Sequence, residues 1–259
     1  MDLPEWRRKI RDLYLAGPPE VIPDRFFDNT YDFPRVTIRP SVYLIAATPR
    51  SGSHYLGHLL FATKQLGAPL EYISLYGYRR WQQIVGSEDP VTVLSEIMAR
   101  RTSPSGWFGV KTHWSQLLNI GRFEIPREML DFRRIIWIRR CDKIAQAVSF
   151  AIAMQTGAWT NFHEAMREPI YDYQAIADCA DAIKHTEFEW AQFIRRTSVP
   201  HLSLFYEDIR GKEVETVTHI LDWFGLPPMD VPISVSLQKQ ATEINAEWKD
   251  RFLHDMRQQ

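Results

Sequence analysis

The stretch from residue 41 to residue 67 constrains the fold of this chain more than any other. The run SVYLIAAT is short and continuously apolar, which is typical of a central parallel strand buried on both faces. PRSGS follows at once, and then SHYLGHLLFATKQLG, whose apolar residues have helical spacing up to Gly67. The stretch therefore predicts a strand, a tight loop and a helix in direct succession.

The same succession recurs further along the chain. GWFGVKTH at 106–113 and FRRIIWIRR at 132–140 are short apolar runs of strand type. CDKIAQAVSFAIAMQTG follows the second run and predicts a helix, with Asp142 as its N-terminal cap and Gly157 as its stop. A long helix is predicted over 175–197. The chain thus has a second strand-to-helix unit.

The last elements complete an alternating pattern. PHLSLFYEDI predicts another strand, and KEVETVTHILDWFGLP predicts a helix that ends at Gly225. Strands that alternate with helices indicate a three-layer α/β fold with a mainly parallel sheet, whose ligands bind at the carboxyl ends of the strands. We expect residues 1–40 to be an irregular lead-in with one helix, and 41–259 to be a single domain, since 259 residues are few for two full domains.

Charge and cysteine content exclude several classes of protein. The 31 basic residues nearly cancel the 32 acidic ones, so no overall field favours nucleic acid or a membrane surface. Cys141 and Cys179 form no CxxC pair, which argues against a disulfide framework and a structural zinc site. No apolar run approaches the length that spans a bilayer. We expect a cytoplasmic protein without a metal, a nucleic-acid partner or a membrane insertion.

The loop PRSGS and the pair Arg139 and Arg140 are the candidate anion sites. Small residues between a strand and a helix expose backbone N–H groups to an anion, but this loop lacks the GK[ST] ending of the usual P-loop, and a plain turn is an equal alternative. The arginine pair leaves another strand, ahead of a helix that carries Ser149. Two anion sites at neighbouring strand ends suit a ligand with two separated phosphates, although such arginines also commonly pair with surface carboxylates.

Together these motifs resemble the sulfotransferases that use 3′-phosphoadenosine-5′-phosphosulfate (PAPS), especially the bacterial carbohydrate group that acts on trehalose. The resemblance runs from about Val42 to Phe252, through YLIAATPRSGSHYLGHLL, GAPLEYI, WFGVKTHWSQL, RRCDKIAQAVSFAIAMQTGAW, FYEDI and QKQATEINAEWKDRF. It implies the sulfotransferase fold with a P-loop-like phosphosulfate-binding loop. It also implies transfer of a sulfuryl group from PAPS to a hydroxyl of a carbohydrate or glycolipid, and a homodimer.

The resemblance assigns the donor-binding residues. In that family the first loop holds the 5′-phosphosulfate, which implies Arg50, Ser51, Gly52, Ser53 and His54 here, although Thr or Ser is more frequent at the position of His54. The Arg and Ser that hold the 3′-phosphate match Arg140 and Ser149, with Arg139 as an open alternative. Lys239 and Gln240 resemble the family's carboxyl-terminal cofactor segment.

Two candidate bases follow from the resemblance. Glu71 in GAPLEYI matches the Glu that takes the acceptor proton in the trehalose group, and His113 in FGVKTHW matches the His with that role in the wider cytosolic sulfotransferases. We favour Glu71 as the base, with His113 orienting a substrate. Lys111 and Arg50 would then stabilise the leaving oxygen.

Further expectations concern two neighbouring segments. Residues 72–105, with Tyr76, Tyr78, Arg79, Arg80 and Trp81, are expected to line or cover the acceptor pocket. Tyr206, Glu207 and Asp208 are expected to end a strand and to have a structural role.

Two other functions compete with this interpretation. A nucleotide-dependent kinase of a small molecule also uses a phosphate loop on a parallel sheet, but the GK[ST] ending and an evident magnesium carboxylate after a strand are missing. A non-catalytic cofactor- or sugar-binding protein would not need Glu71, Lys111 and His113 together. Stabilisation by adenosine 3′,5′-bisphosphate, by ATP with magnesium, or by neither distinguishes the three.

Overall fold

The computed structural model describes residues 23–36, 38–160, 165–228 and 243–258. The helix expected near the N-terminus, before residue 23, lies outside the described residues. So do Lys239 and Gln240.

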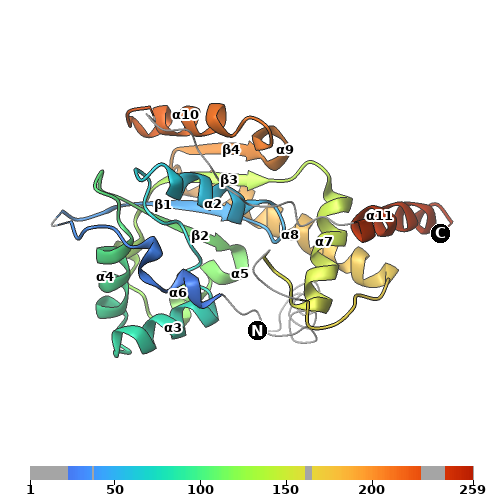
Figure 1. Ribbon diagram of the computed structural model, residues 1–259, viewed down its shortest axis with the longest axis horizontal. Coiled ribbons are helices and arrows are strands. Elements are labelled where there is room, and N and C mark those ends of the chain that lie inside the picture. The colour runs from blue at the N-terminus through green and yellow to red at the C-terminus, as the bar shows by residue number, and fades with distance from the viewer. Residues whose placement is uncertain (1–22, 37, 161–164, 229–242, 259) are drawn as a thin grey trace.

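Four parallel strands form one sheet in the order β2-β1-β3-β4 (Figure 1). Their bounds are Ser41–Ala47 for β1, Trp107–His113 for β2, Phe132–Arg139 for β3 and His201–Phe205 for β4. In the register of the central pair, Ser41 lies opposite Trp107 and Ala47 lies opposite His113. The parallel α/β fold is confirmed, and all four strands end at the same edge of the sheet.

Helices connect the strands, and the three at 143–156, 173–197 and 213–224 lie close to their predicted ranges. Asp142 caps α7 by accepting the Ala145 N–H at 2.9 Å, and Gly157 ends it in a left-handed conformation. The bounds are η1 Asp24–Phe26, η2 Asn29–Tyr31, α2 Ser53–Ala62, α3 Leu75–Val85, α4 Pro90–Arg101, α5 Trp114–Leu117, α6 Asn119–Arg122, η3 Arg127–Leu130, α7 Lys143–Thr156, α8 Tyr173–Thr197, α9 Tyr206–Ile209, α10 Glu213–Phe224 and α11 Glu243–Met256.

Two boundaries differ from expectation. The helix after the first loop ends at Ala62 rather than near Gly67, because the Thr63 hydroxyl donates to the Leu60 carbonyl and accepts the Gln65 N–H in place of further helical bonds. The last strand ends at Phe205, and the next residues form the short helix α9 instead of continuing the strand.

The sheet lies between two layers of helices (Figure 1). Helices α2 and α10 cover one face, where the buried side chains include Tyr43, Ile45, Ile136, Leu56, Leu60, Val217 and Leu221. Helices α3, α4 and part of α8 cover the other face, where they include Leu44, Val110, Trp81, Ile97 and Trp190. This arrangement confirms the three-layer expectation.

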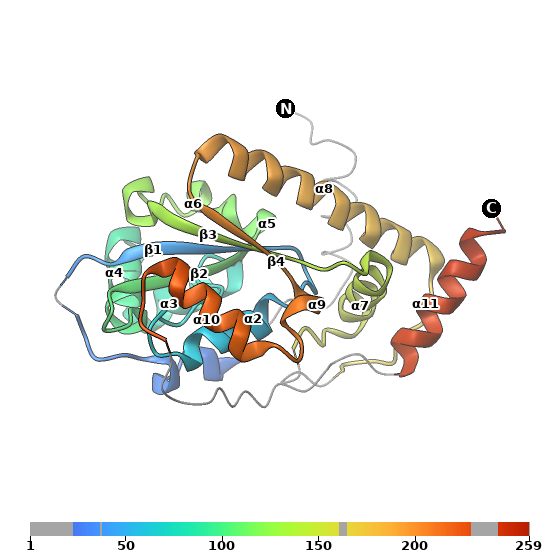
Figure 2. The same cartoon turned by 90° about the horizontal axis from the view of Figure 1, so that it is seen from above.

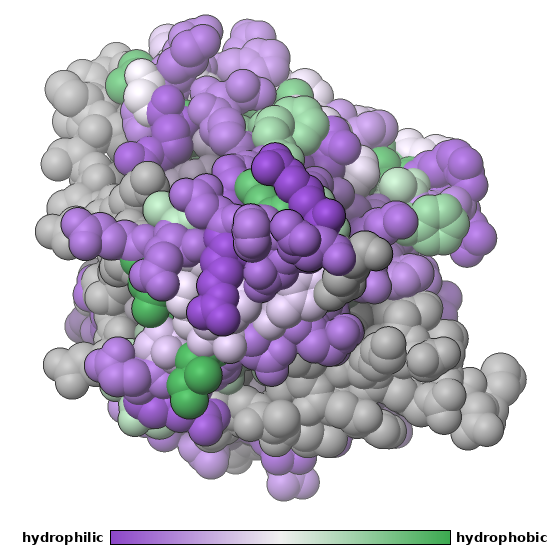
Figure 3. Space-filling view, turned by 90° about the vertical axis from the view of Figure 1, so that its right-hand side faces the viewer, coloured by the Kyte–Doolittle hydropathy of each residue, from purple (hydrophilic) through white to green (hydrophobic). Residues whose placement is uncertain are grey.

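Helices α7, α8 and α11 form a further apolar cluster at one end of the molecule (Figure 2). Trp248 and Phe252 of α11 are each 3% exposed and pack with residues of α7 and α8. The outer surface at this end is mostly hydrophilic, with apolar residues scattered among polar ones (Figure 3). In the described part of the chain, no helix combines the length and apolar character needed to cross a membrane.

Part of the segment 72–105 lies in the core rather than at a pocket. The segment forms α3 and α4, and Tyr78 and Trp81 are buried against the apolar residues of the sheet. The expectation that these two rings line the acceptor pocket is therefore wrong, because α3 packs both of them into the core. Tyr76 is 38% exposed, and its role stays a prediction.

Candidate functional site

The strand order brings two loops together at the carboxyl edge of the sheet. The chain leaves β1 toward β2 on one side, whereas β3 lies on the other side of β1. Open α/β sheets bind ligands at such a reversal of strand order. The loop 48–52 after β1 and the residues 140–142 after β3 therefore flank the position where a ligand is expected.

The loop after β1 has the features of an anion cradle. Gly52 has a φ of +85°, and a Cβ atom there would lie 2.2 Å from Cδ2 of Tyr206, so only glycine fits. The buried Ser51 hydroxyl has no hydrogen-bond partner among the described residues. Gly52 directly precedes α2, and no described side chain caps the N-terminus of that helix. An anion at the loop would accept from the Ser51 hydroxyl and the first N–H groups of α2.

Arg50 connects this loop to α7. Its Nε donates to Oγ of Ser149 at 2.9 Å, and its Nη1 donates to the carbonyl of Trp159. Gln146 of α7 also holds the loop, through bonds from Nε2 to Thr48 Oγ1 and to the Pro49 carbonyl. The predicted residues Arg50 and Ser149 are thus neighbours.

A second cation faces Arg50. Burial, and then the charge of Arg140, lower the pKa of Arg50 to about 10. The two guanidinium groups therefore repel each other. Bound phosphate would relieve this repulsion, so the residues present fit a doubly phosphorylated ligand.

The side chains of Arg139 and Arg140 diverge. The Arg139 guanidinium stacks on the rings of Trp137 and Phe205, at 4.2 and 4.5 Å from their centroids. The Arg140 guanidinium lies 5.6 Å from the ring of Tyr206, the residue that packs on the first loop. Of the two open alternatives, Arg140 is the one near Arg50.

Glu207 holds the chain after β3. Its carboxylate accepts the backbone N–H groups of Cys141 at 2.8 Å and Asp142 at 3.2 Å, and it lies 3.6 Å from Nε of Arg140. These contacts agree with the structural role expected for the segment, although Glu207 lies in α9 and not at the end of a strand.

The predicted bases meet beside the end of β2. Leu70 forms a parallel bridge with Val110, which brings the next residue, Glu71, alongside Lys111. Lys111 Nζ donates to Oε1 of Glu71 in an ion pair whose side chains are 2% and 7% exposed. Nε2 of His113 lies 3.9 Å from the same oxygen. The structure thus brings Glu71, Lys111 and His113 into one cluster.

Charges set the protonation of this cluster. Burial alone would raise the pKa of Glu71, but Lys111, with His113 and His54, outweighs it and holds that pKa well below its usual range. Burial and Lys111 lower the pKa of His113 to about 4, so its imidazole is neutral at pH 7. Its Nδ1 lies 3.3 Å from the Ala47 carbonyl and must carry the proton, which leaves a lone pair on Nε2.

His54 lies with this cluster rather than with Arg50. Its ring stacks on His58 at a centroid distance of 5.8 Å and contacts Phe26 at 5.3 Å. Burial and Lys111 hold its pKa well below the usual value. The side chain of His54 therefore lies beside Lys111 and Glu71, its backbone belongs to the first turn of α2, and its contact with the phosphosulfate stays a prediction.

Sequence reasoning missed two glutamines that organise the site. Gln146 holds the first loop, and Gln116 of α5 joins the Glu71 carboxylate to the backbone of His113. A signal for Gln116 was present in the spacing H-x-x-Q, a variant of the capping box at the start of α5. No local signal marked Gln146.

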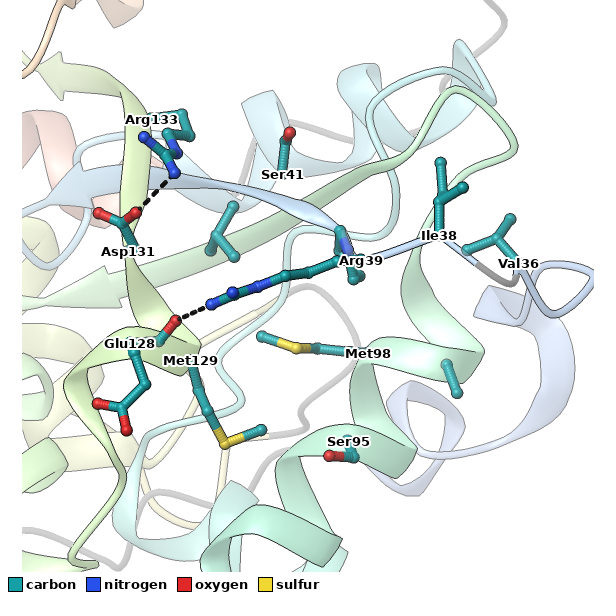
Figure 4. A pocket seen from close by; sticks show the side chains of 13 residues that line it. Val36, Ile38, Arg39, Ser41, Ser95, Met98, Glu128, Met129, Asp131 and Arg133 are labelled. Carbon is teal, nitrogen blue, oxygen red and sulfur yellow. Dashed lines mark hydrogen bonds and ion pairs between the residues drawn. The ribbon is translucent and has the colours of Figure 1, made fainter.

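A cavity of about 510 Å³ lies at the opposite end of the sheet, at the beginnings of β1 and β3 (Figure 4). Its basic groups are engaged within the chain, since Arg39 donates to the Glu128 carbonyl at 2.8 Å and Arg133 lies 2.9 Å from Asp131. None of the predicted site residues lines it. The candidate site is therefore the cluster at the carboxyl edge.

Comparisons with known proteins point to one family. Residues 42–255 match the family described as Stf0 sulphotransferase. The chain is 28% identical, over 255 residues, to a trehalose 2-sulfotransferase of Mycobacterium tuberculosis, and the match covers 83% of this chain and 94% of that protein. It is 27% identical to a trehalose 2-sulfotransferase of Mycolicibacterium smegmatis over 256 residues, covering 83% of this chain and 96% of that protein.

Proposed function

This chain belongs to the Stf0 sulphotransferase family, and from that premise we propose that it transfers a sulfuryl group from PAPS to a hydroxyl of a carbohydrate or glycolipid. The observation that carries the proposal is the pairing of two groups at one sheet edge. Arg50, Arg140 and Ser149 form a phosphate-binding group, and Glu71, Lys111 and His113 form a buried proton-accepting group. The two trehalose 2-sulfotransferases support a sugar as the acceptor.

The first group would hold the donor. Arg50, Ser51 and the first N–H groups of α2 face the phosphosulfate side, with Gly52 and Ser53 shaping that turn. Arg140 and Ser149 face the 3′-phosphate. PAPS supplies an activated sulfuryl group whose transfer leaves negative charge on a phosphate oxygen. Preorganised donors aimed at that oxygen lower the barrier.

The second group would act on the acceptor. An alcohol is a poor nucleophile at neutral pH, so a base must take its proton as it attacks. We assign that role to Glu71, whose carboxylate is ionised. The lone pair on Nε2 of His113 accepts from a hydroxyl of the acceptor and orients it. Lys111 holds Glu71 in place and contributes positive charge where the leaving oxygen develops its own negative charge.

Thermal unfolding with two ligands tests the proposed function. Adenosine 3′,5′-bisphosphate, the product of the donor, is expected to stabilise the protein by about 2.7 kcal/mol at a hundred times its Kd. ATP with magnesium is expected to stabilise it much less. Stabilisation by ATP with magnesium, without stabilisation by adenosine 3′,5′-bisphosphate, would favour a kinase. Labelled transfer to a panel of sugars that begins with trehalose then separates an enzyme from a binding protein.

Arg140→Ala and Ser149→Ala are each expected to reduce the preference for adenosine 3′,5′-bisphosphate over 5′-AMP about tenfold or more, because each removes a contact to the 3′-phosphate. Calorimetric titration with both nucleotides measures the preference. Arg139→Ala is the matched control, since that side chain stacks on Trp137 and Phe205 and should leave the preference unchanged. Loss of the preference in Arg139→Ala alone would show that Arg139 is the phosphate ligand.

A further inference from the structure

We propose that Gln116 is a positioning residue, whose side-chain amide fixes the orientation of the Glu71 carboxylate and holds it in the ionised form. The inference rests on the proposed function, in which Glu71 takes the proton of the acceptor. Gln116 itself need touch neither substrate. It would act through Glu71 alone.

The backbone of the preceding residues fixes which way the Gln116 amide points. The His113 N–H donates to Gln116 Oε1 at 3.0 Å, and the Thr112 hydroxyl donates to the same atom at 3.3 Å. A backbone N–H can only donate, so the atom that it meets must be the amide oxygen. The amide nitrogen of Gln116 is therefore the atom that faces Glu71. The residue is 6% exposed, so water does not compete freely for these bonds.

The Glu71 carboxylate is thereby held at both oxygens. Gln116 Nε2 donates to Oε2, while Lys111 Nζ donates to Oε1. Donors of this kind stabilise the charged form of a carboxyl group. A proton on Oε2 would point at the Gln116 N–H group and break that hydrogen bond. The side chains whose charges act on Glu71 come from two elements, Lys111 and His113 from β2 and His54 from α2. Of these, Lys111 forms the ion pair with Oε1, and Gln116 adds a neutral donor from α5.

Gln116 also links the positions of the two candidate bases. The terminal torsion of a Glu side chain is broad, so a carboxylate held only at Oε1 can rotate. Because Gln116 is bonded to the backbone of His113, its contact with Oε2 ties the plane of the Glu71 carboxylate to the start of α5. A rotated carboxylate would meet the acceptor hydroxyl at a poorer angle, and small errors of this kind reduce turnover steeply.

Two substitutions separate orientation from charge. Gln116→Met keeps a similar volume and removes the donor, so kcat is expected to fall about tenfold while the affinity for adenosine 3′,5′-bisphosphate stays within twofold. Gln116→Glu places a second carboxylate against Oε2, and two carboxylates at one site share a proton, which raises one pKa strongly. Glu71 in the wild type stays ionised across pH 5–8 because its pKa is depressed. In Gln116→Glu, kcat/KM is expected to fall as the pH decreases through that range.

Two measurements test the inference. The pH dependence of kcat/KM is recorded with PAPS and trehalose, or with whichever sugar in the panel the wild type sulfates fastest. The carboxyl group of Glu71 is titrated by carbon NMR on protein with labelled glutamate, and its signal is assigned by its loss in Glu71→Gln. Gln174→Glu, on the exposed surface of α8, is the charge-matched control and should change neither measurement.

The outcomes are distinguishable from failure of the proposed function. A raised titration of Glu71 in Gln116→Glu, with a matching acid limb in the rate profile, supports the inference. An unchanged Glu71 titration in folded Gln116→Glu and Gln116→Met would overturn it, because a merely structural residue changes the melting temperature and not the titration. If the wild type sulfates no sugar, the proposed function fails, and the NMR titration still decides whether Gln116 controls Glu71.

Discussion

Glu71→Gln is expected to slow the chemical step about a hundredfold or more and to leave donor affinity nearly unchanged. The substitution keeps the shape of the side chain and removes its ability to take a proton. Single-turnover transfer across pH measures the step, and calorimetry with adenosine 3′,5′-bisphosphate measures the donor affinity separately. His113→Ala is expected to cost less, since His113 orients the acceptor in this account.

The buried ion pair between Glu71 and Lys111 calls for a control, because Glu71→Gln also changes stability. Glu71→Gln leaves the Lys111 ammonium, only 2% exposed, without its carboxylate, and breaking a buried pair in this way costs about 3–5 kcal/mol of stability. The double variant Glu71→Gln with Lys111→Met removes both charges and is expected to recover much of that stability without recovering the rate. Recovery of the rate would mean that Glu71 serves only to pair Lys111.

The opposite pattern of rates would identify the other base. If Glu71→Gln transfers normally and His113→Ala is inactive, His113 takes the proton. The free lone pair on its Nε2 makes that outcome chemically sound. The chain would then work like the wider cytosolic sulfotransferases rather than like the trehalose group.

Arg50→Ala is expected to weaken donor binding and turnover together, by about a hundredfold, because it removes a charged donor from the loop proposed to hold the phosphosulfate. The Arg50 guanidinium is held against Ser149 and beside Arg140, so it needs no rearrangement to meet an anion. Arg50→Lys keeps the charge but loses the planar fork, and an intermediate effect is expected. Calorimetric affinity equal to that of the wild type would contradict this role.

Local sequence patterns were sufficient for most of the fold. Strands β1 and β2 are short apolar runs that are buried on both faces. The cap Asp142 and the stop Gly157 act within a single turn of their helix. The end of α2 was misplaced because Thr63 makes its own local bonds, which apolar spacing does not reveal. The burial of Tyr78 and Trp81 was likewise missed, because it depends on how α3 packs on the sheet.

The candidate site shows what sequence reasoning could not reach. The resemblance named Glu71 and Lys111, but their ion pair joins residues 40 positions apart and depends on the parallel bridge between Leu70 and Val110. The link from Arg50 to Ser149 likewise depends on two loops meeting at the reversal of strand order. The direction of the His54 ring depends on Phe26, and the Gln116 amide meets a carboxylate 45 positions away. Such long-range contacts leave no periodic trace in a single sequence.

Single-turnover transfer from sulfur-labelled PAPS tests the central claim most directly. The purified protein is mixed with a small amount of labelled donor and an excess of trehalose, with parallel reactions for other sugars and glycolipids. The expected result is a labelled sulfate ester on at least one acceptor, formed in equal amount with adenosine 3′,5′-bisphosphate and nearly absent with Glu71→Gln. Label that stays on the donor with every acceptor, while ATP with magnesium phosphorylates one of them, would contradict the account.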